Sequence, residues 1–176
     1  MDSNEHADSL VALLPAGADA ARLIVCERSG RWAAALRREM GGAVAMLQEA
    51  RSLPGAWDLL DGSPASFVLV ELTRAGAADL LRRMARLQRD YPLARVAIVA
   101  DRRLGSYEWL MREAGAVHFT CSPRQLGPMY RLACRHLAQS PPPRRSAAQR
   151  ILASLPWQTP GGNRADGSEA GRQSSS

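Results

Sequence analysis

The sequence contains no lysine. All 23 basic residues of the 176-residue chain are arginines, and with 17 acidic residues they give a formal net charge of +6. The absence of lysine excludes a lysine nucleophile, a Schiff-base lysine and the phosphate-binding lysine of a P-loop. Aromatic residues are also few, at 5% of the chain. We therefore expect a core built mainly from Leu, Val, Ala and Met.

Cysteines and long apolar runs are scarce as well. Cys26, Cys121 and Cys134 form an odd set without a Cys-x-x-Cys spacing, which argues against a disulfide framework and fits a reducing cytoplasm. The first residues are acidic and lack the basic region of a signal peptide, and no run approaches the roughly 18 apolar residues of a membrane span. These features predict a soluble, cytoplasmic protein that makes no membrane contact.

Histidines and cysteines do not form a metal motif. The spacings of His118, Cys121, Cys134 and His136 match no common zinc module. We expect these side chains to lie in the core or on the surface, and we predict no metal and no cofactor.

The chain falls into three parts by composition. Residues 1–20 form an acidic lead that we expect to be flexible, and residues 140–176 form a Pro- and Arg-rich tail that we expect to be disordered, apart from one short helix at 147–155. Between them, apolar segments alternate five times with helical patterns. The expected strands are 22–27, 43–48, 66–72, 95–101 and 117–122, and the expected helices are 29–42, 53–62, 75–92, 104–116 and 123–139.

Five such alternations predict an α/β fold with a doubly wound parallel sheet and helices on both faces. A domain of this size suits the flavodoxin-like strand order 2-1-3-4-5, in which strands one and three are neighbours. Both of these strands run from apolar residues into an acid, Glu27 in "RLIVCER" and Glu71 in "FVLVELT". We expect the two carboxylates to meet at the carboxyl edge of the sheet, where ligands of such folds bind, although both could simply be solvated strand ends.

The segment from residue 113 to residue 123, "EAGAVHFTCSP", resembles the end of a response-regulator receiver domain. Gly115 and Ala116 precede the fifth strand, Phe119 takes the place of the switch aromatic, and Pro123 closes the motif. "SFVLVEL" resembles the third strand of that family, with Glu71 at the phosphorylated aspartate. The resemblance covers the central part of the chain and implies a receiver-like domain at residues 21–139.

The resemblance also implies that the phosphorylation chemistry is lost. Of the family's pocket only Glu27 keeps its residue type; Arg28 replaces the second metal-binding acid, Ala100 the hydroxyl residue, and Ser122 the lysine. Phosphoryl transfer to a carboxylate requires a metal and a cation to stabilise the transferred group. We therefore predict a pseudo-receiver that is not an enzyme.

Arg28 is predicted to take over the role of the lost metal. Its guanidinium would bridge Glu27 and Glu71, which otherwise would repel each other. The alternative is that Arg28 points to solvent. A carboxylate hydrolase and a flavin site are both disfavoured, because no activated nucleophile and no phosphate cradle accompany the acids.

Three functions follow as hypotheses. The favoured one is a pseudo-receiver that acts in signal transduction by protein–protein contact, with an unidentified partner or a second copy of itself. Its candidate partner surface comprises Trp109, which we expect to be exposed, and Ile151, Leu155 and Trp157 in the tail. A nucleic-acid-associated regulator that uses the Arg-rich faces is less favoured. A receiver phosphorylated at Thr73 or Ser122 is the third.

Overall fold

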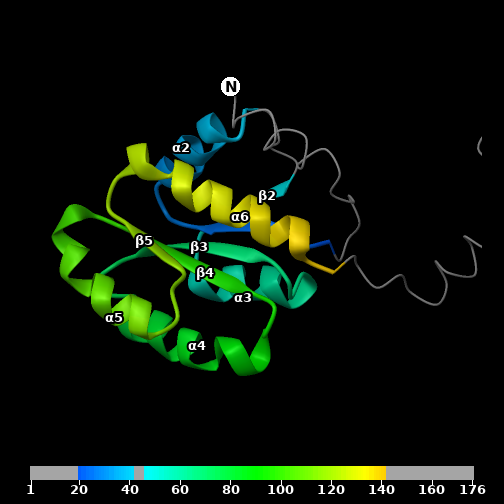
Figure 1. Ribbon diagram of the computed structural model, residues 1–176. Coiled ribbons are helices and arrows are strands. Elements are labelled where there is room, and N and C mark those ends of the chain that lie inside the picture. The colour runs from blue at the N-terminus through cyan, green and yellow to red at the C-terminus, as the bar shows by residue number, and fades with distance from the viewer. Residues whose placement is uncertain (1–19, 42–45, 142–176) are drawn as a thin grey trace, which may run out of the picture. The chain divides into compact units, whose positions relative to one another are not determined.

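The central part of the chain is a five-stranded, all-parallel sheet with the strand order β2-β1-β3-β4-β5. A computed structural model describes residues 20–41 and 46–141 (Figure 1). This order, with helices on both faces of the sheet, is the flavodoxin-like architecture that the alternating sequence pattern predicts.

The elements follow the predicted order. The strands are β1 (Leu23–Cys26), β2 (Leu47–Ala50), β3 (Phe67–Leu72), β4 (Arg95–Ala100) and β5 (His118–Thr120). The α-helices are α2 (Arg31–Glu39), α3 (Leu53–Gly62), α4 (Ala77–Asp90), α5 (Glu108–Glu113) and α6 (Gly127–Gln139), and two 3₁₀ segments, η2 (Arg102–Tyr107) and η3 (Pro123–Gln125), precede α5 and α6.

The sheet separates two hydrophobic layers, because alternate residues of each strand point to opposite faces. On one face Leu23 and Val25 of β1 pack with Trp32 and Leu36 of α2 and with residues of α6. On the other face Ile24 and Cys26 pack with residues of α3, α4 and α5. Figure 1 shows α2 and α6 on one side of the sheet and α3, α4 and α5 on the other. This two-sided cover leaves the carboxyl edge as the place where the βα connections gather.

Several local predictions need correction. The second strand is Leu47–Ala50, so it ends two residues later than the predicted strand 43–48, of which residues 43–45 lie outside the described residues. The segment expected as one helix at 104–116 begins as 3₁₀ and becomes α-helical only at Glu108. An apolar stripe of Tyr107, Leu110, Met111 and Ala114 predicts that Leu110 is buried, but it is 38% exposed.

The predicted acidic lead, the tail and its short helix lie outside the described residues, apart from Ala20, Ser140 and Pro141. Ile151, Leu155 and Trp157 belong to that tail. Within the described ranges, none of the helices combines the length and apolar character that crossing a membrane requires.

Candidate functional site

Glu27 is a buried cap on helix α2. Its Oε2 accepts hydrogen bonds from the backbone N–H of Trp32 at 2.9 Å and from the Ser29 hydroxyl at 3.3 Å, and its Oε1 accepts from the N–H of Ala33 at 2.5 Å. The residue is only 3% exposed. The side chain of Glu27 therefore satisfies the first N–H groups of the helix, where a carboxylate also interacts favourably with the helix dipole.

The start of α2 explains why Glu27 takes this role. The helix begins after Gly30, whose φ of 76° lies in the left-handed region, and the hydroxyl of Ser29 accepts a hydrogen bond of 3.3 Å from the N–H of Arg31, the first helical residue. Glycine adopts this conformation without the cost that a Cβ imposes, but it has no side chain to cap the helix. The carboxylate of Glu27, three residues before Gly30, accepts from the next two N–H groups, those of Trp32 and Ala33.

Glu71 lies beside Glu27 at the carboxyl edge but has different partners. Its Oε1 accepts a hydrogen bond of 3.2 Å from the indole N–H of Trp32 and lies 4.0 Å from the guanidinium of Arg31. Its Oε2 accepts from the backbone N–H of Arg28 at 3.2 Å. The side chain is 17% exposed. The arrangement thus gives each oxygen of Glu71 a donor from the segment that follows β1.

The prediction that Arg28 bridges the two acids is wrong. Arg28 is exposed, and within residues 20–41 and 46–141 its guanidinium forms no ion pair with either carboxylate. Because Glu71 binds the backbone N–H of Arg28 and Glu27 turns towards α2, the side chain of Arg28 is left to point outwards. The cation near Glu71 is that of Arg31, which also lies over the Trp32 ring at 4.7 Å.

A cleft of about 260 Å³ lies at this edge of the sheet. Glu27, Arg28 and Glu71 line it, together with residues that follow β2 and β3, among them Arg51 and Thr73. The hydroxyl of Thr73 already accepts a hydrogen bond of 3.1 Å from the N–H of Gly76. The cleft thus collects acids and guanidinium groups in one place, and the strand order brings three of the five predicted pocket positions together.

The other two predicted positions and the switch aromatic lie elsewhere. Ala100 is fully buried at the end of β4 and pairs with Leu72. Phe119 is 6% exposed and belongs to the core on the α3–α5 side. Ser122 faces a different hollow, described below. Neither Ala100 nor Ser122 lines the cleft that contains Glu71.

The pKa values of the cysteines and of two histidines are shifted mainly by burial. Burial, reinforced by Glu71, raises the pKa of the Cys26 thiol to about 11. Burial also raises the pKa of Cys134 and of Cys121, and lowers the pKa of His118 and His136. In the described part of the chain, no three His, Cys, Asp or Glu side chains are grouped so as to hold a metal ion.

A second, larger hollow of about 610 Å³ lies between α2 and the ends of β4 and β5. We call it the arginine groove, and its lining includes Arg31, Arg38, Arg102 and Arg124, the acid Glu39, and Ser122. Sequence reasoning missed this site. The signal was present, because an arginine follows each of the five strands at the carboxyl edge.

Trp109 is the most exposed large apolar side chain in the described part of the chain. It is 71% exposed, as predicted, and Leu110 and Val117 are 38% and 37% exposed. We call these three residues of the α5–β5 segment the Trp109 surface. Because Trp is rarely left in water without a role, this surface is a candidate for partner contact.

Comparisons of the chain with protein-family models, with curated proteins and with solved structures gave no match. The fold and the two sites therefore rest on the residues themselves.

Proposed function

We propose that this protein is a degenerate receiver-like module that binds a protein partner in a regulatory pathway and does not transfer phosphate. A cytoplasmic location belongs to the same proposal, and three free thiols support it.

One observation carries the proposal: the two carboxylates of the candidate pocket already serve as acceptors for the segment that follows β1. Glu27 binds two N–H groups of α2 and is almost fully buried, and Glu71 accepts from the Arg28 N–H and the Trp32 indole. A phosphorylated carboxylate needs an oxygen free to attack, a metal beside it and a cation to hold the transferred group. Here a hydrogen-bonded Glu71 faces Arg31, and the receiver's lysine position is Ser122.

The Trp109 surface supports a function in protein contact. The resemblance to receivers implies that the surface around the fourth helix, the fifth strand and the fifth helix, here α5, β5 and α6, is the output or dimer face. Trp109 and Leu110 lie on α5 within that region and are exposed. Aromatic side chains of this kind are enriched at the energetic centres of interfaces. The partner is either another protein or a second copy of this chain.

The loss of chemistry is tested by incubating the full-length protein with acetyl phosphate and Mg²⁺ and measuring its intact mass. We expect no phosphoryl adduct. A stoichiometric, acid-labile adduct that disappears in Glu71→Gln would contradict the proposal. An acid-stable phosphoester adduct that persists in Glu71→Gln but disappears in Thr73→Val or Ser122→Ala would support the third hypothesis instead.

Partner contact is tested with Trp109→Ala and a matched control, Leu93→Ala. Leu93 is also an exposed large apolar residue, at 49%, but precedes β4 and lies outside the Trp109 surface. Wild type and Leu93→Ala should either capture the same defined set of proteins from lysate or form a dimer detected by analytical ultracentrifugation. Trp109→Ala should do neither. Equal retention in both variants would show that the Trp109 surface is not the interface.

A further inference from the structure

The charge of the arginine groove is largely uncompensated. Of its four arginines only Arg31 has an ion pair among the described residues, at 4.0 Å from Glu71. Arg38, Arg102 and Arg124 are exposed and make no ion pair within residues 20–41 and 46–141. Glu39 is the single acid in the lining. The groove is therefore a concave surface with a net positive charge, which attracts anions.

The arginines of α4 show that this charge is not typical of the whole surface. There Arg82 and Arg83 both form ion pairs with Asp79, and Arg89 pairs with Asp90. Asp79 and Asp90 thus offset half of the charge of the four arginines of α4. The difference points to the groove, and not to α4, as the surface that would bind an acidic ligand.

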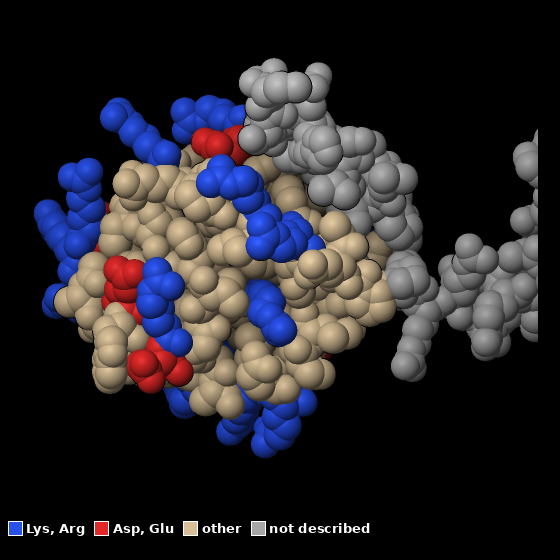
Figure 2. Space-filling model, viewed as in Figure 1, with Lys and Arg blue, Asp and Glu red and all other residues tan. Residues whose placement is uncertain are grey.

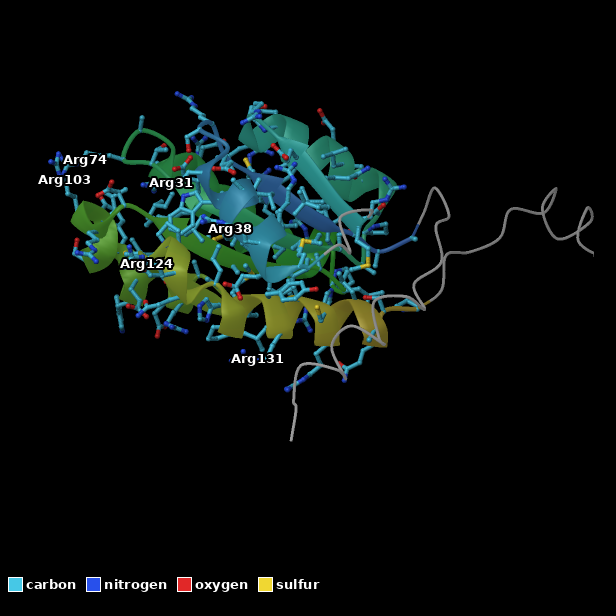
Figure 3. The ribbon with its side chains drawn as sticks, turned by 90° about the horizontal axis from the view of Figure 1, so that it is seen from above. Arg31, Arg38, Arg74, Arg103, Arg124 and Arg131 are labelled. Carbon is cyan, nitrogen blue, oxygen red and sulfur yellow. The ribbon has the colours of Figure 1, made fainter. Side chains whose placement is uncertain are left out.

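The positive charge continues beyond the groove in both directions. Figure 3 shows Arg74 and Arg103 together at one end of the molecule, Arg31, Arg38 and Arg124 around α2 and the connection that leads to α6, and Arg131 projecting from α6. The side chains of Glu39 and Arg131 both approach Gly127. Glu39 Oε2 lies 3.4 Å, and Arg131 Nη1 lies 3.5 Å, from the point where a Cβ on Gly127 would be. Arg131 therefore flanks Glu39 at the edge of the groove. Figure 2 shows basic side chains at the top, the left and the lower edge of the molecule, with acidic side chains beside some of them. The arginines that Figure 3 labels extend the basic surface beyond the groove.

The chemistry of the lining selects among anionic ligands. Arginine clusters also bind acidic peptides, but buried apolar or aromatic anchors carry most of the energy of protein interfaces. The exposed large apolar residues, Leu93, Trp109, Leu110 and Val117, do not line the groove. A single-stranded nucleic acid would need aromatic side chains on which its bases stack, and the lining contains none. Guanidinium groups match the geometry of phosphate oxygens with forked hydrogen bonds. Regularly spaced phosphates without exposed bases therefore fit best.

We propose that the arginine groove binds the sugar–phosphate backbone of duplex nucleic acid without reading its sequence. Arg38, Arg102 and Arg124 contact phosphates in the groove, and Arg131 and Arg103 extend the contact at either end. This binding is separate from the protein contact through Trp109, because the two surfaces share no residue.

The test is fluorescence anisotropy of a labelled, mixed-sequence DNA duplex of about 20 base pairs, titrated with the full-length protein between about 50 and about 200 mM salt. The groove variant carries Arg38→Ala, Arg102→Ala and Arg124→Ala; Arg31 is kept because it contacts Glu71. The control variant carries Arg82→Ala, Arg86→Ala and Arg89→Ala, which remove the same charge from α4. All six residues are exposed, so both variants should melt like the wild type.

The wild type should bind the duplex with a steep salt dependence. The groove variant should bind about tenfold or more weakly, and its log–log salt slope should fall by about 2 to 3, since each lost phosphate contact removes about one counterion. The control should keep most of the affinity. The proposal is overturned if the wild type does not bind the duplex, or if the groove variant and the control variant lose the same amount of affinity for it. It is also overturned if single-stranded DNA or poly-glutamate binds more tightly than the duplex.

Discussion

The indole N–H of Trp32 donates a hydrogen bond of 3.2 Å to Oε1 of Glu71, across the junction between β1 and β3. The ring of Trp32 is fully buried against the sheet. A residue that packs the core with its ring thus holds the carboxylate of the candidate pocket with its one polar atom. This bond ties the position of Glu71 to the start of α2.

The Trp32–Glu71 hydrogen bond should appear as a coupling energy. In a double-mutant cycle of Trp32→Phe and Glu71→Ala, urea unfolding followed by circular dichroism should give a coupling of about 1 kcal/mol, because the bond is to a charged but partly exposed acceptor. Trp57→Phe is the matched control, since Trp57 packs on the opposite face of the sheet. Additivity within about 0.3 kcal/mol in the Trp32 cycle would show that the bond contributes nothing.

The carboxylate of Glu27, which caps α2, should contribute more to the free energy of unfolding than the Trp32–Glu71 hydrogen bond does. Glu27→Ala removes the acceptor of two first-turn N–H groups of α2 and leaves them buried, so it should lower the free energy of unfolding by about 3 kcal/mol. Glu27→Gln keeps one carbonyl acceptor and should cost less.

Glu39→Ala serves as the control for the loss of an acid, because Glu39 is exposed in the last turn of α2. It should change the free energy of unfolding by no more than about 0.5 kcal/mol. If Glu27→Ala were as mild as Glu39→Ala, the capping role of Glu27 would be refuted.

The layout of the fold could be predicted because the signals were local and repeated. The apolar run of β3 and the stripe of Leu80, Met84 and Leu87 in α4 are each readable within one element. The strand order follows from the number of β/α alternations and the handedness of their crossovers. The second strand was misplaced because its described residues are only partly buried, apart from Ala50, and so its apolar pattern is weak.

The roles of the site residues could not be predicted in the same way. The pattern correctly placed Glu27 and Glu71 at one edge, but it could not reveal that Glu27 turns into α2, since that follows from the helix starting after Gly30. Nor could it distinguish Arg28 from Arg31 as the cation near Glu71, because the direction of a side chain in a βα connection depends on the turn. Backbone donors such as the Arg28 N–H leave no trace in residue type.

The three thiols should react in two classes. Cys26 and Cys134 are buried and have raised pKa values, about 11 for Cys26, whereas Cys121 is only partly buried. With Ellman's reagent at neutral pH, the native protein should release one equivalent slowly, since burial also raises the pKa of Cys121. All three should react in guanidinium chloride. Cys121→Ser should abolish the native reaction; native release that persists in this variant would show that the sheet opens readily.

The stability of the protein should fall as the pH drops through the range in which free histidine titrates. Burial lowers the pKa of His136, and nearby Arg95 lowers it further. The hydrogen bond of 2.8 Å that Nε2 donates to the carbonyl oxygen of Ala65 raises this pKa and so offsets part of the shift. The unfolded chain therefore binds the proton first. The stability that neutral His136 contributes to the folded state is fully present above the unfolded pKa of about 6.5, and it is lost as the pH falls from there through the lower folded pKa.

His136→Gln, which can still donate to Ala65, should reduce the slope of the unfolding free energy between about pH 7.5 and about pH 5.5. His118 has a pKa lowered mainly by burial, so His118→Gln should remove a separate share of the slope. If the slopes of wild type and both single variants coincide, the shifted titrations do not contribute to stability.

Arg31, and not Arg28, should be the arginine that interacts with Glu71. The guanidinium of Arg31 lies 4.0 Å from Oε1, whereas Arg28 offers only its backbone N–H, which an alanine also has. Double-mutant cycles with Glu71→Ala should therefore be additive for Arg28→Ala, within about 0.3 kcal/mol, and should show a coupling of up to about 1 kcal/mol for Arg31→Ala. The Arg31 coupling should weaken in high salt, because Arg31 is 46% exposed and the pair is screened. A salt-sensitive coupling to Arg28 instead would mean that its guanidinium turns inward to the acids in solution, as the sequence alone suggests.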